Sequence, residues 1–259
     1  MGLEYDGSAF LGWQVQRQQP TIQGTVEQAL ARVADHDLRV TVCGRTDTGV
    51  HALCQVAHFD TEARRSERSW VLGVNSHLPA SLSVLWVREV DESFHARFSA
   101  FARTYRYVIL NRWIRPALHA RYVAWCRQPL DAGRMHEAAQ CLLGEHDFSA
   151  FRAAGCQARH AVRDLQRIEV RRAGSRVEFE VTANGFLYHM VRNLAGSLMA
   201  VGRGERDADW LSAVLAGRDR NQAAPTAPSE GLYFVGARFP TEYGLPPGEV
   251  EFPRGTDGS

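Results

Sequence analysis

The sequence contains no lysine, because all 30 basic residues among its 259 are arginine. Lysine supplies the Schiff-base nucleophile, the phosphate-binding side chain of P-loops and the ATP-binding side chain of protein kinases, so these three chemistries are excluded. The chain also lacks a G-x-S-x-G nucleophile elbow. Catalysis would therefore have to come from carboxylate, Tyr, His, Cys or Arg side chains.

Cysteine is scarce, and the sequence shows no metal-binding spacing. The five cysteines are odd in number and form no C-x-x-C pair, and the ten histidines include no H-E-x-x-H motif. A disulfide framework or a zinc site is therefore not expected, and a reduced, cytoplasmic setting fits. No run of 18 apolar residues is present, and the N-terminus lacks the features of a signal peptide, so we expect no membrane association.

Positive charge is concentrated although the net charge is only +1. Residues 97–127 contain seven arginines and no acidic residue, and residues 152–176 contain seven arginines against Asp164 and Glu169. Aromatic residues are interleaved with the first cluster. Arginine binds phosphates and aromatic rings stack on bases, which suits a nucleic acid. A solvated strand face with half of its rings in the core remains an equal alternative at this point.

The segment VCGRTDTGVHALCQVAHFDT (residues 42–61) places Asp47 in a polar turn between two strand-like runs. An aspartate between glycines commonly stabilises a turn, because its carboxylate accepts nearby backbone N–H groups. We expect Gly44 and Gly49 to adopt positive φ angles there. Sequence spacing alone leaves open whether Asp47 forms only a turn or is also a nucleophile.

The periodicity of apolar residues predicts alternating strands and helices in both halves. In the first half, Thr25 is a candidate N-cap of the helix. The predicted strands and helices of that half follow in the order strand 2–7, helix 21–34, strands 38–43 and 51–61, helix 69–78 and strand 82–90. The second half has a similar order of predicted elements. They are strand 102–111, helix 132–144, strands 162–172 and 175–185, helices 187–202 and 207–217, and strand 231–239.

These patterns predict an α+β fold of two ferredoxin-like (β-α-β-β-α-β) halves with antiparallel sheets. The predicted boundaries are 1–95 for the first half, 96–240 for the second and 241–259 for a flexible tail rich in Pro, Gly and acidic residues. Tyr105 and Tyr107 alternate with Arg106 on one strand and therefore point to the same face. We expect Tyr107 to be a core ring.

Six motifs occur in an order and spacing that resemble the TruA family of tRNA pseudouridine synthases over the whole chain except the tail. They are EYDGSAFLGWQVQ (4–16), GRTDTGVHA (44–52), FHARFSA (94–100), ARTYRY (102–107), FLYHMVRN (186–193) and SEGLYFV (229–235). The resemblance implies the pseudouridine synthase fold, with an active-site cleft between the halves. It also implies isomerisation of uridine at positions 38, 39 and 40 of the tRNA anticodon stem-loop, a homodimer and no cofactor.

By position, the resemblance gives Asp47 the role of nucleophile, Tyr105 that of the base-contacting tyrosine and Arg192 that of the arginine paired with the aspartate. Arg45 would help to displace the target base. Two segments match RNA-contacting positions of the family: Phe94, His95, Ala96, Arg97 and Phe98 in one, and Gly155, Cys156, Gln157, Ala158 and Arg159 in the other.

The chemistry is consistent with these residue types. Pseudouridine formation breaks the C1′–N1 bond and joins C1′ to C5, and a carboxylate can attack either C6 of uracil or C1′ of ribose. Burial alone would protonate the carboxylate, so this interpretation needs an arginine partner. The uridine must also leave its stack. The alternatives are a non-catalytic tRNA-binding or tRNA-folding factor on the same scaffold and a glycosidase, for which no second carboxylate is evident.

Overall fold

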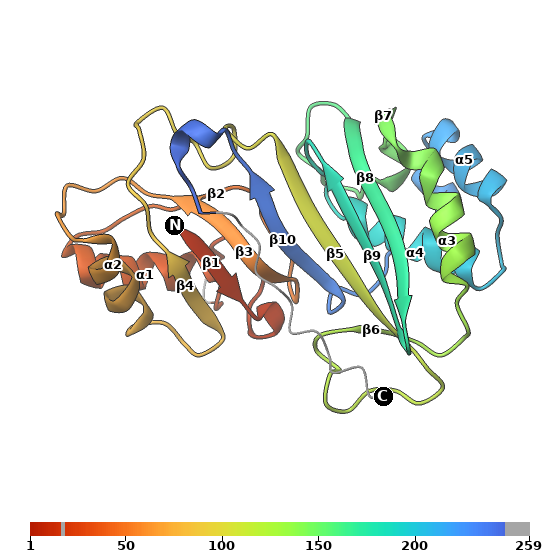
Figure 1. The fold of residues 1–259 in the computed structure, drawn as a ribbon, viewed down its shortest axis with the longest axis horizontal. Helices are drawn as coiled ribbons and strands as arrows, with labels where there is room; N and C mark the ends of the chain where they lie inside the picture. The colour runs from red at the N-terminus through yellow and green to blue at the C-terminus, as the bar shows by residue number, and fades with distance from the viewer. Residues whose placement is uncertain (17–18, 247–259) are drawn as a thin grey trace. The chain divides into compact units, whose positions relative to one another are not determined.

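The computed structural model describes residues 1–16 and 19–246, and the chain divides into two compact units (Figure 1). The first comprises Met1–Phe101 and the described residues from Phe234 on, and the second comprises Ala102–Tyr233. The sequence-based division placed the boundary between residues 95 and 96 and assigned the last strand to the second half. A residue belongs to a unit because of its contacts with residues far apart in the sequence, and local sequence patterns do not reveal such contacts.

The predicted tail, 241–259, falls largely on residues 247–259, which lie outside the described residues. Its first residues are ordered, because Thr241–Tyr243 forms a 3-10 helix. The Tyr243 ring lies 5.0 Å from the ring of Phe94, centroid to centroid, in an edge-on contact. The start of the predicted tail therefore packs on the first unit.

The first unit has the predicted β-α-β-β-α-β order. Its elements are β1 (Gly2–Tyr5), α1 (Ile22–Ala34), β2 (Thr41–Val42), β3 (His51–His58), α2 (Glu67–Asn75) and β4 (Leu82–Trp86). Strand β1 lies between β4 and β3, β2 pairs with β3, and all three pairings are antiparallel. This is the strand order of the split βαβ fold, so the prediction for this half is confirmed. Strand β2 is shorter than predicted and covers only two residues of 38–43.

Helix α1 buries one face, formed by Ile22, Val26 and Leu30 at four-residue spacing. Its N-cap is Thr21, whose side-chain oxygen accepts the N–H of Gly24 at 3.4 Å. The prediction that Thr25 is the cap was wrong. Thr25 lies one turn inside the helix, and its hydroxyl donates to the carbonyl of Thr21 at 2.9 Å.

The substitution Thr21→Ala is expected to lower the free energy of unfolding by about 1 kcal/mol, because the Gly24 N–H loses its partner. The midpoint of urea unfolding measures this change. Thr25→Ala is the matched control, and we expect it to change the free energy by less than about 0.5 kcal/mol because no orphan N–H depends on it. Equal effects of both substitutions would contradict the cap assignment.

The second unit contains β5 (Ala102–Asn111), β6 (Ala124–Cys126), α3 (Ala132–Ala139), β7 (Gly144–Asp147), β8 (Val162–Ala173), β9 (Arg176–Ala183), α4 (Met190–Gly202) and α5 (Ala208–Gly217); strand β10 (Leu232–Arg238) begins in it. Its sheet has the order β5-β9-β8-β7, with antiparallel pairs, and β6 runs parallel to β5. The α+β class is confirmed. Strands β6 and β7 were not predicted, because β6 has three residues and β7 is the polar segment GEHD.

Helix α4 is buried over almost its whole surface and packs against α3 and β5 (Figure 1). Twelve of its thirteen residues are buried, and the exception is Arg192. A charged side chain that reaches out of an otherwise buried helix is unusual, because such helices normally carry apolar residues all round. Arg192 is therefore the one charged residue of α4 and the one residue of the helix that is not buried.

Within the part of the chain that the structure describes, no helix has the length and apolar composition needed to cross a bilayer. Nor do the described His, Cys, Asp and Glu side chains form a group of three or more that could hold a metal ion. All five cysteines are free thiols.

Candidate active site

Asp47 lies in a tight turn that follows β2 in the first unit. The carbonyl of Asp47 accepts the N–H of Val50 at 3.2 Å, and Gly49 has a φ of +79°. Only glycine adopts this conformation without strain, so the expectation for Gly49 is confirmed. Gly44 is not among the described glycines with positive φ, so that expectation was wrong. The Asp47 residue is half-buried, and the neighbouring Arg45 is exposed.

The motif 4–16 holds this turn from two sides at Thr46. The Tyr5 hydroxyl lies 2.8 Å from the Thr46 hydroxyl, and the Trp13 N–H donates to the Thr46 carbonyl at 2.9 Å. A side chain at Gly12 would bring a Cβ atom within 2.8 Å of the same carbonyl. The two motifs are therefore parts of one structure, in which the residue before Asp47 is fixed by both its side chain and its backbone.

Buried polar groups continue beneath the turn. Burial raises the pKa of Tyr5 to about 12, so its hydroxyl stays protonated at neutral pH. Gln55 donates from Nε2 to the Tyr5 hydroxyl at 3.4 Å and to the Gly44 carbonyl at 2.7 Å. Because the Tyr5 oxygen accepts from Gln55, its own proton is available to Thr46. The buried Oε1 atom of Gln55 has no hydrogen-bond partner among the described residues.

His51 lies at the start of β3 and is buried. Its Nδ1 atom lies 3.2 Å from the Asp6 carboxylate and accepts the N–H of Gly7 at 3.2 Å. Gly7 also lies so close to the Val50 carbonyl that a Cβ atom would fall 1.9 Å from it. These contacts connect the end of β1 with the end of the Asp47 turn and fit a structural role for His51.

Tyr105 and Tyr107 lie on β5 in the second unit. Tyr107 is fully buried, and its hydroxyl donates to the Pro228 carbonyl at 2.8 Å, which confirms that it is a core ring. Burial raises the pKa of Tyr107, and the nearby charge of Arg192 opposes this shift. Tyr105 is 9% exposed and meets the Phe186 ring edge-on at a centroid distance of 5.0 Å.

The backbone next to α4 fixes the Arg192 side chain. Its Nε atom donates to the Ala227 carbonyl at 2.8 Å, and its own carbonyl accepts the Ala227 N–H at 3.1 Å. One terminal nitrogen lies 3.3 Å from Nε2 of His189, the N-cap residue, which has a φ of +58°. The guanidinium is thus oriented through Nε.

The segment 224–228, which binds Arg192, is itself anchored. Thr226 donates to the buried side chain of Asn193 at 2.6 Å, and Arg220 binds both of these side chains at 3.1 Å. The carbonyl of Pro228, the residue after Ala227, accepts a hydrogen bond from the Tyr107 hydroxyl. Strand β5, which carries Tyr105, and helix α4, which carries Arg192, are therefore tied to adjacent carbonyls of one segment.

The loop 155–159 wraps around the guanidinium of Arg152, which donates to the carbonyls of Cys156 at 2.7 Å and Ala158 at 2.9 Å. The Tyr188 N–H points to the Cys156 sulfur at 3.5 Å. Partial burial raises the pKa of the Cys156 thiol, but the backbone N–H groups of Tyr188 and Ala158 and the side chain of Arg152 stabilise the thiolate, and the net effect is a lowered pKa. The loop is thus attached to the segment that precedes α4, and Arg159 at its end is exposed.

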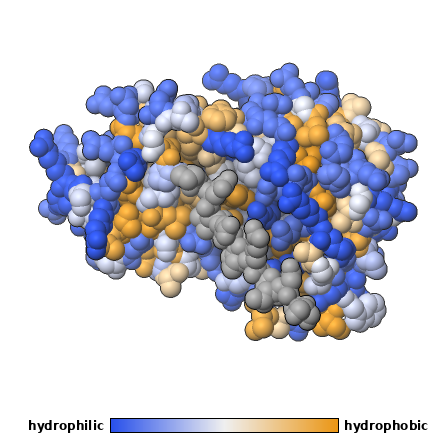
Figure 2. Space-filling view, in the orientation of Figure 1, coloured by the Kyte–Doolittle hydropathy of each residue, from blue (hydrophilic) through white to orange (hydrophobic). Residues whose placement is uncertain are grey.

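The segment 94–98 of the first unit divides by burial. The side chains of Phe94 and Ala96 are buried, whereas Arg97 and Phe98 are exposed. The arginine-rich region 97–127 also contains both buried and exposed side chains. Tyr105 and Tyr107 are buried, whereas Arg97 and Phe98 are exposed. Hydrophobic residues lie on the surface at the bottom of Figure 2, where Figure 1 places the segment that connects β5 and β6. The exposed large hydrophobic side chains of this segment are Trp113, Ile114, Leu118 and Tyr122.

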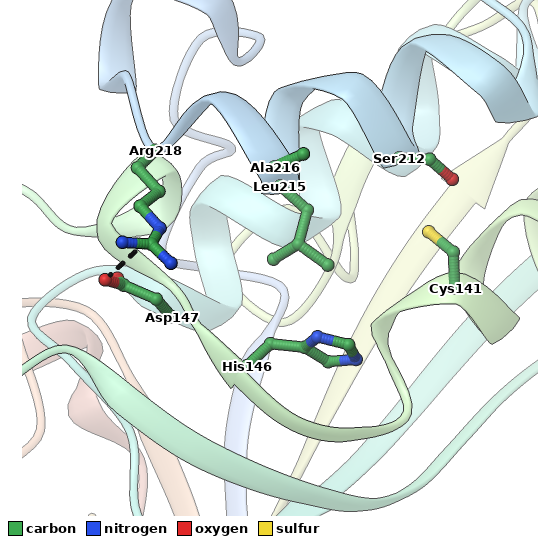
Figure 3. A pocket seen from close by; sticks show the side chains of 7 residues that line it. All are labelled: Cys141, His146, Asp147, Ser212, Leu215, Ala216 and Arg218. Atoms are coloured by element: carbon green, nitrogen blue, oxygen red, sulfur yellow. Dashed lines mark ion pairs between the residues drawn. The ribbon is translucent and has the colours of Figure 1, made fainter.

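A cavity of about 380 Å³ lies elsewhere in the second unit, between β7 and α5 (Figure 3). Arg218 and Asp147, which line it, form an ion pair at 3.5 Å, and His146 binds the Leu143 carbonyl at 2.8 Å. None of the predicted site residues lines it. Its two charged side chains pair with each other and its histidine binds a backbone carbonyl, so it offers no convergent set of charged groups for catalysis.

Comparison with known proteins identifies the family. A family model described as tRNA pseudouridine synthase matches residues 3–99 and 138–240, which is most of the chain. A protein of Methylococcus capsulatus named tRNA pseudouridine synthase A is 58% identical over 245 residues, covering 95% of this chain and 90% of the relative. Proteins of the same name from Xylella fastidiosa strain M23 and Xanthomonas euvesicatoria pv. vesicatoria are 56% and 55% identical, and each match covers 95% of this chain and 96% of the relative. The chain therefore belongs to the tRNA pseudouridine synthase family.

Proposed function

We propose that this protein isomerises uridine to pseudouridine in tRNA, at positions 38, 39 and 40 of the anticodon stem-loop, with Asp47 as the nucleophile. The observation that carries the proposal is the Asp47 turn, in which Thr46 is held by the Tyr5 hydroxyl and by the Trp13 N–H. A half-buried carboxylate on a rigid turn suits attack on a nucleotide that has left its stack. Family membership supplies the substrate class.

The reaction conserves all atoms and electrons of the base apart from exchange of one proton. The C1′–N1 bond breaks, the uracil turns, a C1′–C5 bond forms, and the C5 proton is released while N1 gains one. Asp47 would hold one fragment covalently by attack on C6 or on C1′, and both routes satisfy this balance. The reaction therefore requires no redox cofactor or metal.

The other residues take roles that match their surroundings. Tyr105, a mostly buried ring that Phe186 supports, would stack on the uracil and accept the C5 proton at the end. Arg192, oriented through Nε, would pair with the Asp47 carboxylate and keep it ionised. Arg45, exposed on the turn, would occupy the space that the flipped uridine leaves. The exposed residues of 94–98 and 155–159 would bind the RNA backbone.

As part of this proposal we expect the protein to act in the cytoplasm and as a homodimer, in keeping with the resemblance of its motifs to the family. Size-exclusion chromatography with light scattering measures the oligomeric state directly. A monomer that retained full activity would contradict the expectation of a dimer.

The proposal is tested by tritium release from tRNA labelled at C5 of uridine. The wild-type protein is expected to release tritium from a transcript that carries uridines at positions 38 to 40 and none from a transcript with cytidines there. Tight binding of tRNA without release would instead favour the non-catalytic tRNA-binding protein. Release of tritium from both transcripts would be consistent with pseudouridine formation but would contradict positions 38 to 40 as the targets.

A further inference from the structure

His189, the N-cap residue of α4, has a backbone conformation that is unusual at the start of a helix. Its φ and ψ angles are +58° and 6°, in the left-handed region that residues other than glycine rarely adopt. The other described non-glycine residues with positive φ, Asp35 and Arg218, follow the ends of α1 and α5, where a left-handed residue is common. An N-cap residue is normally extended, and its side chain accepts a helical N–H. The His189 side chain makes no such capping bond.

Backbone hydrogen bonds on both sides hold His189 in this conformation. The Tyr188 carbonyl accepts the Ala153 N–H at 3.1 Å, and the Tyr188 N–H points to the Cys156 sulfur at 3.5 Å. The His189 carbonyl accepts the Asn193 N–H at 2.9 Å. Strain of this kind persists only where the surrounding structure imposes it, and strained residues are concentrated at functional sites. The conformation of His189 therefore points to a function of its side chain.

The side chain of His189 contacts Arg192, which lies three residues further along the chain. A terminal nitrogen of the Arg192 guanidinium lies 3.3 Å from Nε2 of His189. A guanidinium can only donate hydrogen bonds, so Nε2 is the acceptor and the neutral ring carries its proton on Nδ1. The Tyr188 ring lies against the imidazole, with a centroid distance of 4.0 Å and an interplanar angle of 30°. The backbone and a neighbouring ring thus both restrict the position of this acceptor.

The guanidinium of Arg192 has a second partner in the Ala227 carbonyl, to which Nε donates at 2.8 Å. One hydrogen bond leaves a planar group free to turn about that bond, whereas bonds from two nitrogens of the plane fix its orientation. Pairing with a carboxylate depends on this orientation, because the N–H donors of arginine form a rigid fork. His189 therefore supplies the second of the two contacts that align the guanidinium.

We propose that His189 is a positioning residue for pseudouridine formation, which accepts a hydrogen bond from Arg192 and so sets the plane of the guanidinium. The proposal rests on the proposed function, in which Arg192 pairs with the Asp47 carboxylate and keeps it ionised. It goes further in assigning a role to a histidine that transfers no proton and contacts no substrate. It also gives a reason for the left-handed conformation before α4.

The test measures kcat and KM by tritium release from tRNA labelled at C5 of uridine, together with the melting temperature. His189→Gly removes the acceptor but suits a left-handed backbone. It is expected to lower kcat about 10- to 100-fold, the loss of one hydrogen bond to a charged group, and to change KM less than about two-fold. Its melting temperature should equal that of wild type or exceed it by up to about 4 °C, because glycine relieves the strain.

A second variant, His189→Gln, tests the acceptor itself. The glutamine side chain can present an amide oxygen to Arg192 in place of Nε2, so kcat should stay within about three-fold of wild type. The matched control is His119→Gln, because His119 is an exposed histidine of the same unit. This control should leave kcat and KM unchanged.

A double-mutant cycle shows whether His189 acts through Arg192. In an Arg192→Gln protein, His189→Gly is expected to cause no further loss of kcat, because no guanidinium remains to be oriented. A further loss of the same size as in wild type would overturn the proposal, since His189 would then act independently of Arg192.

Two other results would also overturn the proposal. One is a wild-type kcat for His189→Gly, and the other is a loss of kcat in both His189 variants that follows a fall in melting temperature, which would indicate a purely structural role. The absence of tritium release by the wild-type protein would instead refute the proposed function itself. The two failures are therefore distinguishable.

Discussion

Replacing Asp47 with asparagine is expected to reduce pseudouridine formation at saturating tRNA by about 10⁴-fold or more, because an amide cannot act as the covalent nucleophile. The substitution should leave the turn intact. The turn is held by the backbone bond from Val50 to the Asp47 carbonyl and by the contacts of Thr46, none of which uses the carboxylate. Binding of tRNA should therefore stay within a few-fold of wild type. Single-turnover tritium release from C5-labelled tRNA measures the rate.

Asp37→Asn is the matched control for this experiment. Asp37 is an exposed aspartate of the same unit, beyond the end of α1, and its substitution should change the rate less than about two-fold. Equal tritium release by wild type and the Asp47→Asn protein would remove Asp47 from the chemistry. A loss of tRNA binding parallel to the loss of rate would show that the carboxylate acts in binding or folding.

The substitution Arg192→Lys is expected to lower the single-turnover rate about 10²- to 10³-fold, although it preserves the positive charge. Arginine binds the Ala227 carbonyl through Nε, and its terminal nitrogens are the groups that we propose to pair with the carboxylate. Lysine has one nitrogen, which can bind either the carbonyl or the carboxylate in a defined geometry but cannot reproduce both contacts. We expect Arg192→Gln to lose at least as much, because it also removes the charge.

The folded state should tolerate Arg192→Lys. The backbone pair between Arg192 and Ala227 does not involve the side chain, and Thr226 and Asn193 continue to anchor the segment. Arg203→Lys is the matched control, because Arg203 follows the last residue of α4 and pairs with Glu205. That protein should keep nearly full activity. Wild-type rates for Arg192→Lys would show that charge alone suffices and would contradict an oriented guanidinium.

Local patterns in the sequence predicted the helices, the long strands and the short strands β1 and β2, but not the short strands β6 and β7. Strand β5 begins and ends at the predicted residues, 102 and 111, because alternating side chains and its length are properties of the segment itself. Strands β6 and β7 exist only because longer neighbours offer hydrogen bonds. The N-cap of α1 was misplaced by one turn, since two threonines four residues apart present the same local signal.

The parts of the candidate site that lie within one short sequence motif could be predicted from the sequence. The turn at Asp47 and the positive φ of Gly49 follow from six adjacent residues. The support of that turn by Tyr5, Trp13 and Gln55 is not predictable in this way, because it depends on which parts of β1 and β3 lie side by side. The same holds for Arg192, whose orientation depends on a carbonyl 35 residues further along the chain.

The burial of α4 also limits how the second unit can change in evolution. Substitutions at twelve positions of the helix disturb close packing, and at the thirteenth they alter the arginine that we assign to chemistry. The helix therefore has no neutral surface on which variation can accumulate without cost. Variation is tolerated more readily in the exposed connecting segments, such as 112–123, than in α4.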